Sequence, residues 1–334
     1  MNGTGIEEPV ISGGDRKGLV VVTGAGGFIG RHLVRALREA GYRCRAVKRA
    51  ATNDAARDVT QDVPHPGLAP DADWGATVAG ADAIVHLAGL AHMPVDNHAM
   101  RHQLRRINVL STQRLAAAAA QAGVRDFIFM SSIKAVSDHS NRAPLTEDTP
   151  PLPADCYGLA KLAAERRLQR LGRSAAAMRI VLLRPTLVYG PGVRANFAAL
   201  VGLVGRGLPL PLGSIRNRRS LLYVGNLTAA VLRCLERADV PSGTYHLSDG
   251  AAVSTPDLVR AIARAQGRQP RLIGVPLGWL AMAARISGKR EQFARLLGSL
   301  EVSNQHFCRS FDWQPPFTLQ QGLRATLAPG APGA

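Results

Sequence analysis

The chain has 334 residues, of which 46% are hydrophobic, 19% charged and 5% aromatic. This length and composition suit one large α/β domain or two smaller ones, and they exclude a disordered chain. The four cysteines form no CxxC pair, which argues against a disulfide scaffold and a cysteine zinc site. No signal peptide precedes the first apolar run, and the apolar stretch 275–286 is too short to span a membrane. We therefore expect a cytoplasmic protein without a membrane span.

The formal net charge is +17, because 41 Lys and Arg residues outnumber 24 Asp and Glu residues. Such a balance is compatible with a nucleic acid, an acidic membrane surface or an anionic metabolite as partner. Only five of the basic residues are lysines, and the densest cluster comprises Arg216, Arg218 and Arg219. The absence of a longer run of like charge favours a small phosphorylated ligand over nucleic acid, with most arginines on solvated faces.

Short β-branched segments alternate with helical patterns through the first half of the chain. Residues 1–16 lack periodicity and are predicted to be a flexible leader. We predict strands at 18–23, 44–48, 83–87, 126–130 and 180–183, and helices at 29–40, 112–122 and 157–171. This alternation predicts βαβ units in an α/β domain with a doubly wound parallel sheet over residues 17–185.

The pattern changes after Arg184-Pro185, where glycine and proline interrupt the apolar segments. A helix is predicted near 196–205, and residues 223–250 again have α/β character and are expected to return to the sheet. Helices punctuated by proline follow from Thr255, and residues 326–334 form a flexible tail. We therefore predict a smaller C-terminal substrate-binding lobe over residues 186–325.

A glycine-rich turn, VVVTGAGGFIG, joins the first strand to the first helix. Glycines are needed where the backbone turns sharply and approaches a pyrophosphate, and a helix N-terminus offers free N–H groups to its charge. Strand, turn and helix stand in the required order, which makes this motif specific. It predicts a dinucleotide site formed by five residues: Gly24, Gly27, Phe28, Ile29 and Gly30.

The end of the second strand indicates which dinucleotide is bound. An acidic residue there would bind the ribose hydroxyls, whereas a basic residue would accept a 2′-phosphate. Lys48 and Arg49 occupy this position, and the next acidic residue is Asp54. The sequence thus favours NADP(H) over NAD(H). Two pairs are candidates to line the adenine: Asp58 with Val59, or Asp62 with Val63.

Tyr157 and Lys161 lie four residues apart at the start of a predicted helix and therefore share one face. A phenol near its ordinary pKa of ~10 is a poor base at neutral pH, and a nearby cation lowers that pKa. Ser132 follows the strand 126–130 and can orient a substrate oxygen. This combination predicts proton transfer to or from an alcohol or ketone.

Six motifs are specific in combination: TGAGGFIG, HLAG at 86–89, NVLST with Asn108, FIFMSSIK at 127–134, YGLAK, and LRPTLVYGPG at 183–192. Over residues 19–325 the chain resembles the extended short-chain dehydrogenase/reductases, with a Rossmann fold, in the NAD(P)-dependent epimerase/dehydratase branch acting on nucleotide sugars. The resemblance implies Tyr157 as acid/base, Lys161 as its pKa-lowering neighbour on the nicotinamide ribose, and Ser132 on the substrate hydroxyl. It implies further cofactor contacts from Leu87, Ala88, Gly89, Asn108 and Pro185, and it places Asn196 and Arg219 near the nucleotide diphosphate of the substrate.

Departures from the family pattern narrow the expected reaction. Ile133-Lys134 replaces the Asp-Glu pair of the sugar 4,6-dehydratases, so we expect no dehydration. Lys48 and Arg49 depart from UDP-hexose 4-epimerases that carry an acidic residue there. The SSIK motif resembles bacterial polysaccharide proteins, which include UDP-4-keto-sugar reductases, such as UDP-N-acetylquinovosamine dehydrogenase, and UDP-glucose 4-epimerases. We predict a 4-keto-sugar reductase, with a UDP-glucose or UDP-N-acetylhexosamine 4-epimerase as alternative and a non-catalytic NAD(P) sensor as a distant one.

Several other residues have both a functional and a structural interpretation. Lys134 contacts the substrate or caps its strand, and the arginines at 216–219 bind a diphosphate or lie on a surface loop. Cys156 is interpreted as a packing residue. The apolar face of the helix 157–171 belongs to the core or to a homodimer contact. The histidines lack ligand spacing, so no metal site is predicted: His86, His92, His98 and His102.

Overall fold

The computed structural model describes residues 17–48, 61–64, 68, 71–91, 97–141, 143–174, 177–286 and 297–328. The predicted leader, residues 1–16, and most of the predicted tail, residues 329–334, lie outside this part of the chain.

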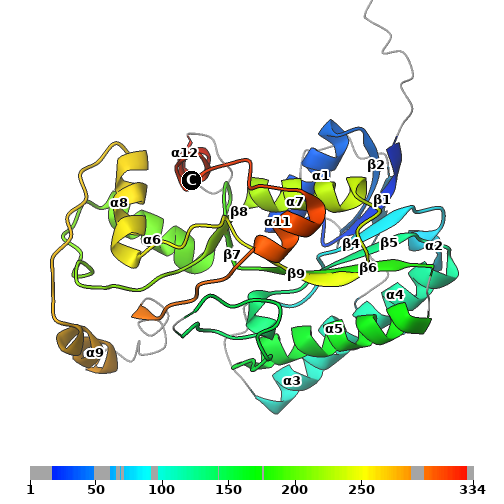
Figure 1. Cartoon of the computed structure of the whole chain (residues 1–334), viewed down its shortest axis with the longest axis horizontal. Coiled ribbons are helices and arrows are strands. Elements are labelled where there is room, and N and C mark those ends of the chain that lie inside the picture. The colour runs from blue at the N-terminus through cyan, green and yellow to red at the C-terminus, as the bar shows by residue number, and fades with distance from the viewer. Residues whose placement is uncertain are drawn as a thin grey trace, which may run out of the picture.

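A seven-stranded parallel sheet forms the centre of the molecule, in the order β3-β2-β1-β4-β5-β6-β9 (Figure 1). Its strands are β1 (Lys17–Thr23), β2 (Tyr42–Lys48), β3 (Gln61–Pro64), β4 (Ala83–His86), β5 (Asp126–Met130), β6 (Arg179–Pro185) and β9 (Gly243–Leu247). The order reverses between β1 and β4, which is the topological switch point of a doubly wound sheet. The predicted α/β fold of the Rossmann type is confirmed.

Helices cover both faces of this sheet (Figure 1). On one face lie α1 (Phe28–Glu39), α7 (Val224–Glu236) and α11 (Gln305–Phe311). On the other lie α2 (Gly75–Val78), α3 (His98–Leu104), α4 (Ser111–Gln121) and α5 (Cys156–Ser174). The sheet is therefore the middle layer of three.

The valines of β1 show why this strand is central. Val20 and Val22 belong to the apolar cluster that contains Leu33 of α1, whereas Val21 belongs to the cluster that contains Leu115 of α4. All three valines are at most 1% exposed. An uninterrupted apolar run is what a parallel strand requires when both of its faces are covered.

Several elements of this domain, α2 among them, are not among those predicted from the sequence. β3 is a four-residue strand that ends in Pro64 and pairs only with β2 at the sheet edge, a position that tolerates proline. The helical segment before α4 comprises α3 and a π-helical stretch, Arg105–Leu110.

A smaller lobe extends from one end of the sheet (Figure 1). It contains a parallel pair, β7 (Leu187–Tyr189) and β8 (Leu221–Tyr223), with α6 (Ala195–Gly205), α8 (Thr255–Ala265), α9 (Leu277–Ile286) and α12 (Leu319–Leu327). Its core includes the buried side chains of Tyr189, Phe197, Ile262 and Leu323. Between these elements the chain returns to the main sheet through α7, which packs on α1, and β9, which pairs with β6. In the described residues, no helix is both apolar and long enough to cross a membrane.

Candidate active site

The predicted site residues follow four neighbouring strands at the same edge of the sheet. Gly24 follows β1, the segment 87–89 follows β4, Ser132 lies two residues beyond β5, and Pro185 ends β6. Backbone bonds extend between these strand ends: Leu87 N donates to Thr23 O at 3.2 Å, and Ser131 N donates to Leu183 O at 2.8 Å. The carboxyl edge of an open parallel sheet, beside its switch point, is where such folds bind ligands.

The turn after β1 requires glycine at two positions. Gly24 has φ of +71°, a left-handed conformation that favours glycine, and a Cβ there would lie 2.9 Å from Ala88 N. A Cβ on Gly30 would overlap the carbonyl oxygen of Gly24. These glycines allow the turn, the first helix and the loop after β4 to pack against one another.

Of the other two glycines of the turn, Gly26 leaves open space at the start of α1, whereas a Cβ on Gly27 would lie 3.2 Å from Gly24 O. Gly26 and Gly27 are exposed, and the nearest atom to a Cβ on Gly26 would be Lys48 Cγ, at 3.9 Å. No side chain caps the helix N-terminus at Gly27, and its first turn, which contains Phe28 and Ile29, has no acidic residue. This cradle, which a side chain would fill, fits the diphosphate of a dinucleotide.

The loop after β4 is held by Asn108, which is only 2% exposed. Its Oδ1 accepts from Leu90 N at 2.8 Å and its Nδ2 donates to Leu90 O at 2.9 Å. A Cβ on Gly89 would lie 3.0 Å from the same Oδ1. Asn108 thus positions the segment that contains Leu87 and Ala88 against the glycine turn.

His86 connects β1, β4 and α4 from within the core. Its Nδ1 lies 2.6 Å from the hydroxyl of Thr23 and its Nε2 lies 2.9 Å from that of Thr112. The Thr23 hydroxyl also accepts from Ala88 N at 3.2 Å. The described residues contain no group of three or more His, Cys, Asp or Glu side chains that could hold a metal; His92 lies outside them.

Helix α5 brings Tyr157 and Lys161 to the end of β5. Lys161 is 5% exposed, and its Nζ donates to Met130 O at 2.8 Å and lies 5.8 Å from the ring centroid of Tyr157. Ser132 follows Met130 by two residues and caps the short 3₁₀ helix Ile133–Ala135, its Oγ accepting from Lys134 N. The phenol, the ammonium and the hydroxyl are therefore held by one helix and the adjoining strand end.

Burial controls the protonation of both helix residues. It raises the pKa of Tyr157 to about 12, with a further contribution from the carboxylate of Asp155. It lowers the pKa of Lys161 to about 8, against the opposing effect of Glu165. The sequence predicted a lowered tyrosine pKa, whereas in this structure desolvation of the phenol and the nearby carboxylate of Asp155 raise it. At neutral pH the phenol holds its proton.

Lys134 has partners other than a substrate. Its Nζ lies 2.5 Å from a carboxylate oxygen of Asp155 and 3.4 Å from one of Asp138. Asp155 Oδ1 also accepts from Gly158 N in the first turn of α5. Lys134 therefore joins the segment after β5 to the start of the helix that carries Tyr157.

The other two predicted substrate residues, Asn196 and Arg219, lie on different segments of the smaller lobe. Asn196 is exposed in the first turn of α6. Arg219 pairs through its backbone with Val253, and its guanidinium donates to Gly298 O at 3.0 Å. Arg218 is paired instead with Glu301, through two bonds of 2.7 Å.

Three predicted cofactor residues, Arg49, Asp58 and Val59, lie outside the described residues. The alternative adenine candidates, Asp62 and Val63, are part of β3 and pair with Ala46 and Val47 of β2.

The family profile described as the NAD dependent epimerase/dehydratase family matches residues 20–247. This chain belongs to that family. It is 35% identical to a UDP-glucose 4-epimerase from Vibrio cholerae, over 94% of this chain and 96% of the relative. Among solved structures, it is similar to MoeE5 in complex with UDP-glucuronic acid and NAD, with a TM-score of 0.73, 28% identity, and coverage of 92% and 97% of the two chains. RMD from Pseudomonas aeruginosa, complexed with NADPH, gives a TM-score of 0.68 and 26% identity, over 93% and 98%.

This family member has a buried ion pair directly behind its site, which the sequence did not predict. Glu165 lies one helical turn after Lys161, and its carboxylate accepts from Arg184 Nε at 3.0 Å and Nη2 at 2.6 Å. The hydroxyl of Ser131, next to Ser132, donates to the same carboxylate. The only sequence signal is its helical spacing from Lys161, four residues on, which places both on one face.

Thr186 is a second polar residue at this edge that the sequence did not single out. Its Oγ1 is buried and has no hydrogen-bond partner in the described part of the chain, while its N–H donates to Leu247 O at 3.0 Å. It directly follows Pro185 in the LRPTLVYGPG motif, which is the signal that could have identified it. A buried hydroxyl without a partner is available to a bound ligand.

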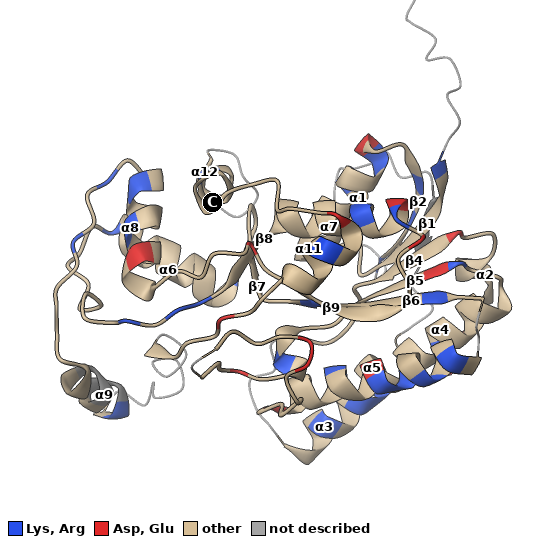
Figure 2. Cartoon of the chain, viewed as in Figure 1, with Lys and Arg blue, Asp and Glu red and all other residues tan. Residues whose placement is uncertain are grey.

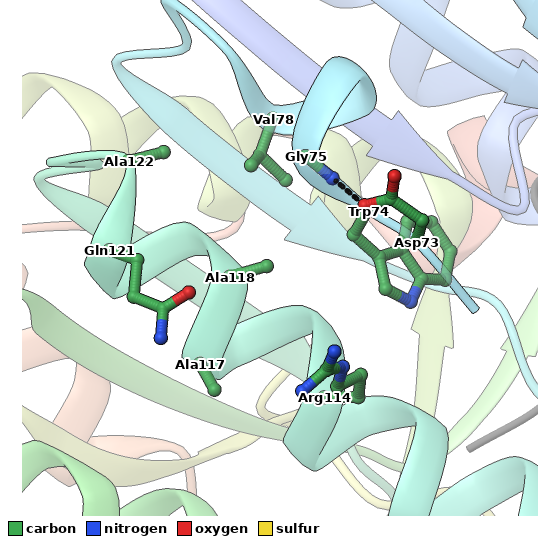
Figure 3. Close-up of a pocket in the computed structure, with 9 residues that line it drawn as sticks. All are labelled: Asp73, Trp74, Gly75, Val78, Arg114, Ala117, Ala118, Gln121 and Ala122. Carbon is green, nitrogen blue, oxygen red and sulfur yellow. Dashed lines mark hydrogen bonds between the residues drawn. The ribbon is translucent and has the colours of Figure 1, made fainter. Parts of the chain in front are cut away.

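Figure 3 shows a pocket between α2 and α4 that is separate from these residues. Asp73, Trp74, Gly75 and Val78 line one side, with Gly75 N donating to Asp73 Oδ1 at 2.9 Å. The α4 side comprises Arg114, Ala117, Ala118, Gln121 and Ala122. It contains none of the predicted site residues, so the carboxyl edge of the sheet remains the candidate active site.

Proposed function

We propose that the protein is an NADP(H)-dependent reductase that acts on the C4 carbonyl of a UDP-4-keto sugar. The observation that carries the proposal is the position of Tyr157, Lys161 and Ser132 at the same sheet edge as the open glycine cradle. A proton donor and a dinucleotide site on one edge are what reduction of a ketone requires. The UDP-sugar class is supported by the V. cholerae relative and by the UDP-glucuronic acid of MoeE5.

Each residue has a defined task in this reaction. Tyr157, protonated at neutral pH, donates its proton to the C4 oxygen, and the Ser132 hydroxyl donates a hydrogen bond that orients the same oxygen. Lys161 binds the nicotinamide ribose and keeps a positive charge beside the phenol as it loses its proton. When bound, the dinucleotide supplies the hydride, so that the carbonyl gains one hydride and one proton. Asn196 and Arg219 are proposed to contact the UDP diphosphate.

Lys48 supports NADP(H) as the cofactor. It ends β2, and its side chain lies next to Gly26 of the cradle. A basic side chain there can bind a 2′-phosphate, whereas the acidic residue that binds an unphosphorylated ribose is absent from the end of this strand. The similar P. aeruginosa protein binds NADPH. Net reduction of a ketone oxidises one NADPH in each turnover, so the oxidised cofactor must leave and a new NADPH must bind.

A 4-epimerase is the second candidate, favoured by the name of the V. cholerae relative. In that reaction Tyr157 would remove the proton of the C4 hydroxyl and later return one. A bound oxidised dinucleotide would accept the C4 hydride and supply it again to the opposite face of the sugar. Burial raises the pKa of Tyr157 to about 12, so the free protein holds the phenol in the protonated form that donates its proton in reduction.

Measurement of cofactor consumption distinguishes reduction from epimerisation. The purified protein is incubated with a UDP-4-keto-6-deoxy sugar and NADPH or NADH, and, in a second assay, with UDP-glucose and no added cofactor. We expect NADPH to be consumed, with kcat/KM for NADPH at least about tenfold above that for NADH, since a charged 2′-phosphate contact is absent from NADH. Formation of UDP-galactose without cofactor consumption would instead identify an epimerase.

Replacement of Tyr157, the proposed proton donor, tests the mechanism for both the reductase and the epimerase reaction. Tyr157→Phe keeps the ring but removes the proton, so kcat should fall by about 10²- to 10⁴-fold while the Kd for NADPH changes little. Tyr42→Phe, at the amino end of β2, is the matched control and should retain full activity. An unchanged kcat in the Tyr157 variant would exclude the assignment.

A further inference from the structure

The outer end of the smaller lobe carries an apolar stripe on α9. Trp279 is 67% exposed, Met282 53% and Ile286 81%. Their spacing of i, i+3 and i+7 places all three on one face of the helix. Figure 1 shows α9 at the far end of the lobe, beyond α6 and α8. Single exposed apolar side chains are ordinary, but an aligned set marks an interaction surface.

The chain before α9 extends this surface. Ile273 N donates to Leu210 O at 2.9 Å, and Leu210 N donates to Arg271 O at 2.8 Å, which aligns the segments around 210 and 272. Exposed apolar side chains occur on both segments and at the start of α9. We call the whole set the α9 patch; it comprises Leu208, Ile273, Leu277, Trp279, Met282 and Ile286.

Basic residues predominate in the part of the sequence that contains α9. Residues 258–290 include seven Lys and Arg residues and no Asp or Glu. Arg268, Arg271 and Arg285 are exposed beside the patch. In Figure 2, Lys and Arg positions are coloured blue on α9 and on the connection that leads to it. The nearest acidic residue before this segment, Asp257, is bonded to Arg260 and Ser254 on α8.

We propose that the α9 patch docks the protein on the surface of a bilayer that contains anionic lipid. The apolar side chains at the centre of the patch can insert among the acyl chains. The arginines around them can bind the acidic headgroups at the membrane surface. Tryptophan favours this boundary, because its ring is apolar and its N–H is polar. At ten residues, α9 lies on the membrane and does not cross it.

The charge pattern favours this occupant over two others. A symmetric contact between two copies would oppose the same arginines across the interface, where like charges repel. A nucleic acid would use the arginines but leave the apolar stripe in water. Docking on lipid is independent of the reaction proposed above, since no residue of the α9 patch belongs to the candidate active site.

Tryptophan fluorescence of the full chain tests the proposal directly. The chain has three tryptophans, and Trp74 and Trp313 are only 1% and 8% exposed, so Trp279 dominates any response to a surface. We expect a blue shift of the emission and co-sedimentation with vesicles of phosphatidylcholine and phosphatidylglycerol. Vesicles of phosphatidylcholine alone should bind at least about tenfold more weakly, and salt should weaken binding to the anionic vesicles.

Variants then test whether the α9 patch is responsible for vesicle binding. Trp279→Ser combined with Ile286→Ser should weaken vesicle binding at least about tenfold, with catalytic activity in solution unchanged. Leu152→Ser, at a side chain that is 79% exposed outside the patch, is the control and should bind as the native chain does. The native chain's fluorescence decides the matter even if the double variant does not fold.

Three outcomes would overturn the proposal. One is the absence of both a blue shift and co-sedimentation with anionic vesicles. Another is equal vesicle binding by the native chain and a folded double variant. The third is a change from dimer to monomer in the double variant, measured by light scattering, with vesicle binding unaltered; the α9 patch would then be a contact between copies.

Discussion

Two arginine–glutamate pairs with similar bonding differ in their surroundings. The side chains of Arg184 and Glu165 are 6% and 1% exposed, whereas those of Arg218 and Glu301 are 62% and 23% exposed. Removal of one partner from a buried pair leaves an unpaired charge in the core. Glu165→Gln should therefore lower the free energy of unfolding by about 3–5 kcal/mol. Urea denaturation at neutral pH measures the loss.

The exposed pair provides the matched control. Glu301→Gln also leaves one bidentate arginine without its carboxylate, but water solvates Arg218, so the loss of stability should be much smaller than that of Glu165→Gln. If the two variants lose the same stability, burial is not what makes the Arg184–Glu165 pair important.

The role of a residue could be predicted where a motif fixes its spacing from other residues. It could not be predicted where the role depends on whether the side chain is buried. Tyr157 and Lys161 could be identified because a phenol and an ammonium four residues apart share a helix face. Glu165 has the same spacing from Lys161, yet a charged residue on a helix is usually solvated, and only the structure shows its burial. The direction of the Tyr157 pKa shift was mispredicted for the same reason.

Two glycines of the turn before α1 are expected to have different roles, one in folding and the other in cofactor binding. A Cβ on Gly30 would overlap Gly24 O, so Gly30→Ala should disrupt the packing of the turn and destabilise the protein. A Cβ on Gly26 would instead enter the open cradle. Gly26→Ala should therefore keep its thermal midpoint and raise the Kd for NADPH at least about tenfold, because the diphosphate loses its close approach to the backbone. Calorimetry and isothermal titration measure the two effects.

Gly202→Ala controls for the added methyl group. Gly202 lies within α6 with no atom close to its missing Cβ, so alanine should stabilise the helix slightly and leave NADPH binding unchanged. A Gly26 variant that binds NADPH as the native chain does would show that the diphosphate lies elsewhere.

Elements were predictable where the local pattern is unambiguous. The strands β1, β4 and β5 are continuous apolar runs, as a sheet covered on both faces demands. β3 has the sequence QDVP, which contains no such run, and it forms only because β2 offers an unpaired edge. The pairing of β7 with β8 joins residues more than thirty positions apart, which periodicity does not reveal.

At the scale of the whole molecule, a histidine in the sheet makes stability depend on pH. His246 of β9 is fully buried, with Nε2 3.5 Å from Arg184 Nη1, and burial together with that charge lowers its pKa to about 3. The unfolded chain takes up this proton as pH falls through about 6.5, whereas the folded chain does not until about 3. The unfolded state therefore binds more protons in this window, and stability is lost as pH falls. From pH 7 to 5 the loss should be about 2 kcal/mol.

Comparison of two histidine variants tests whether His246 causes this loss of stability between pH 7 and 5. His246→Gln cannot take up a proton in either state, so the decrease in unfolding free energy between pH 7 and 5 should shrink by about 2 kcal/mol, whatever its stability at pH 7. His139→Gln changes an exposed ring and should keep the native pH dependence. An equally steep decrease in the His246 variant would place the proton uptake on another group. A smaller decrease would assign the proton uptake to His246, on the strand that pairs with β6.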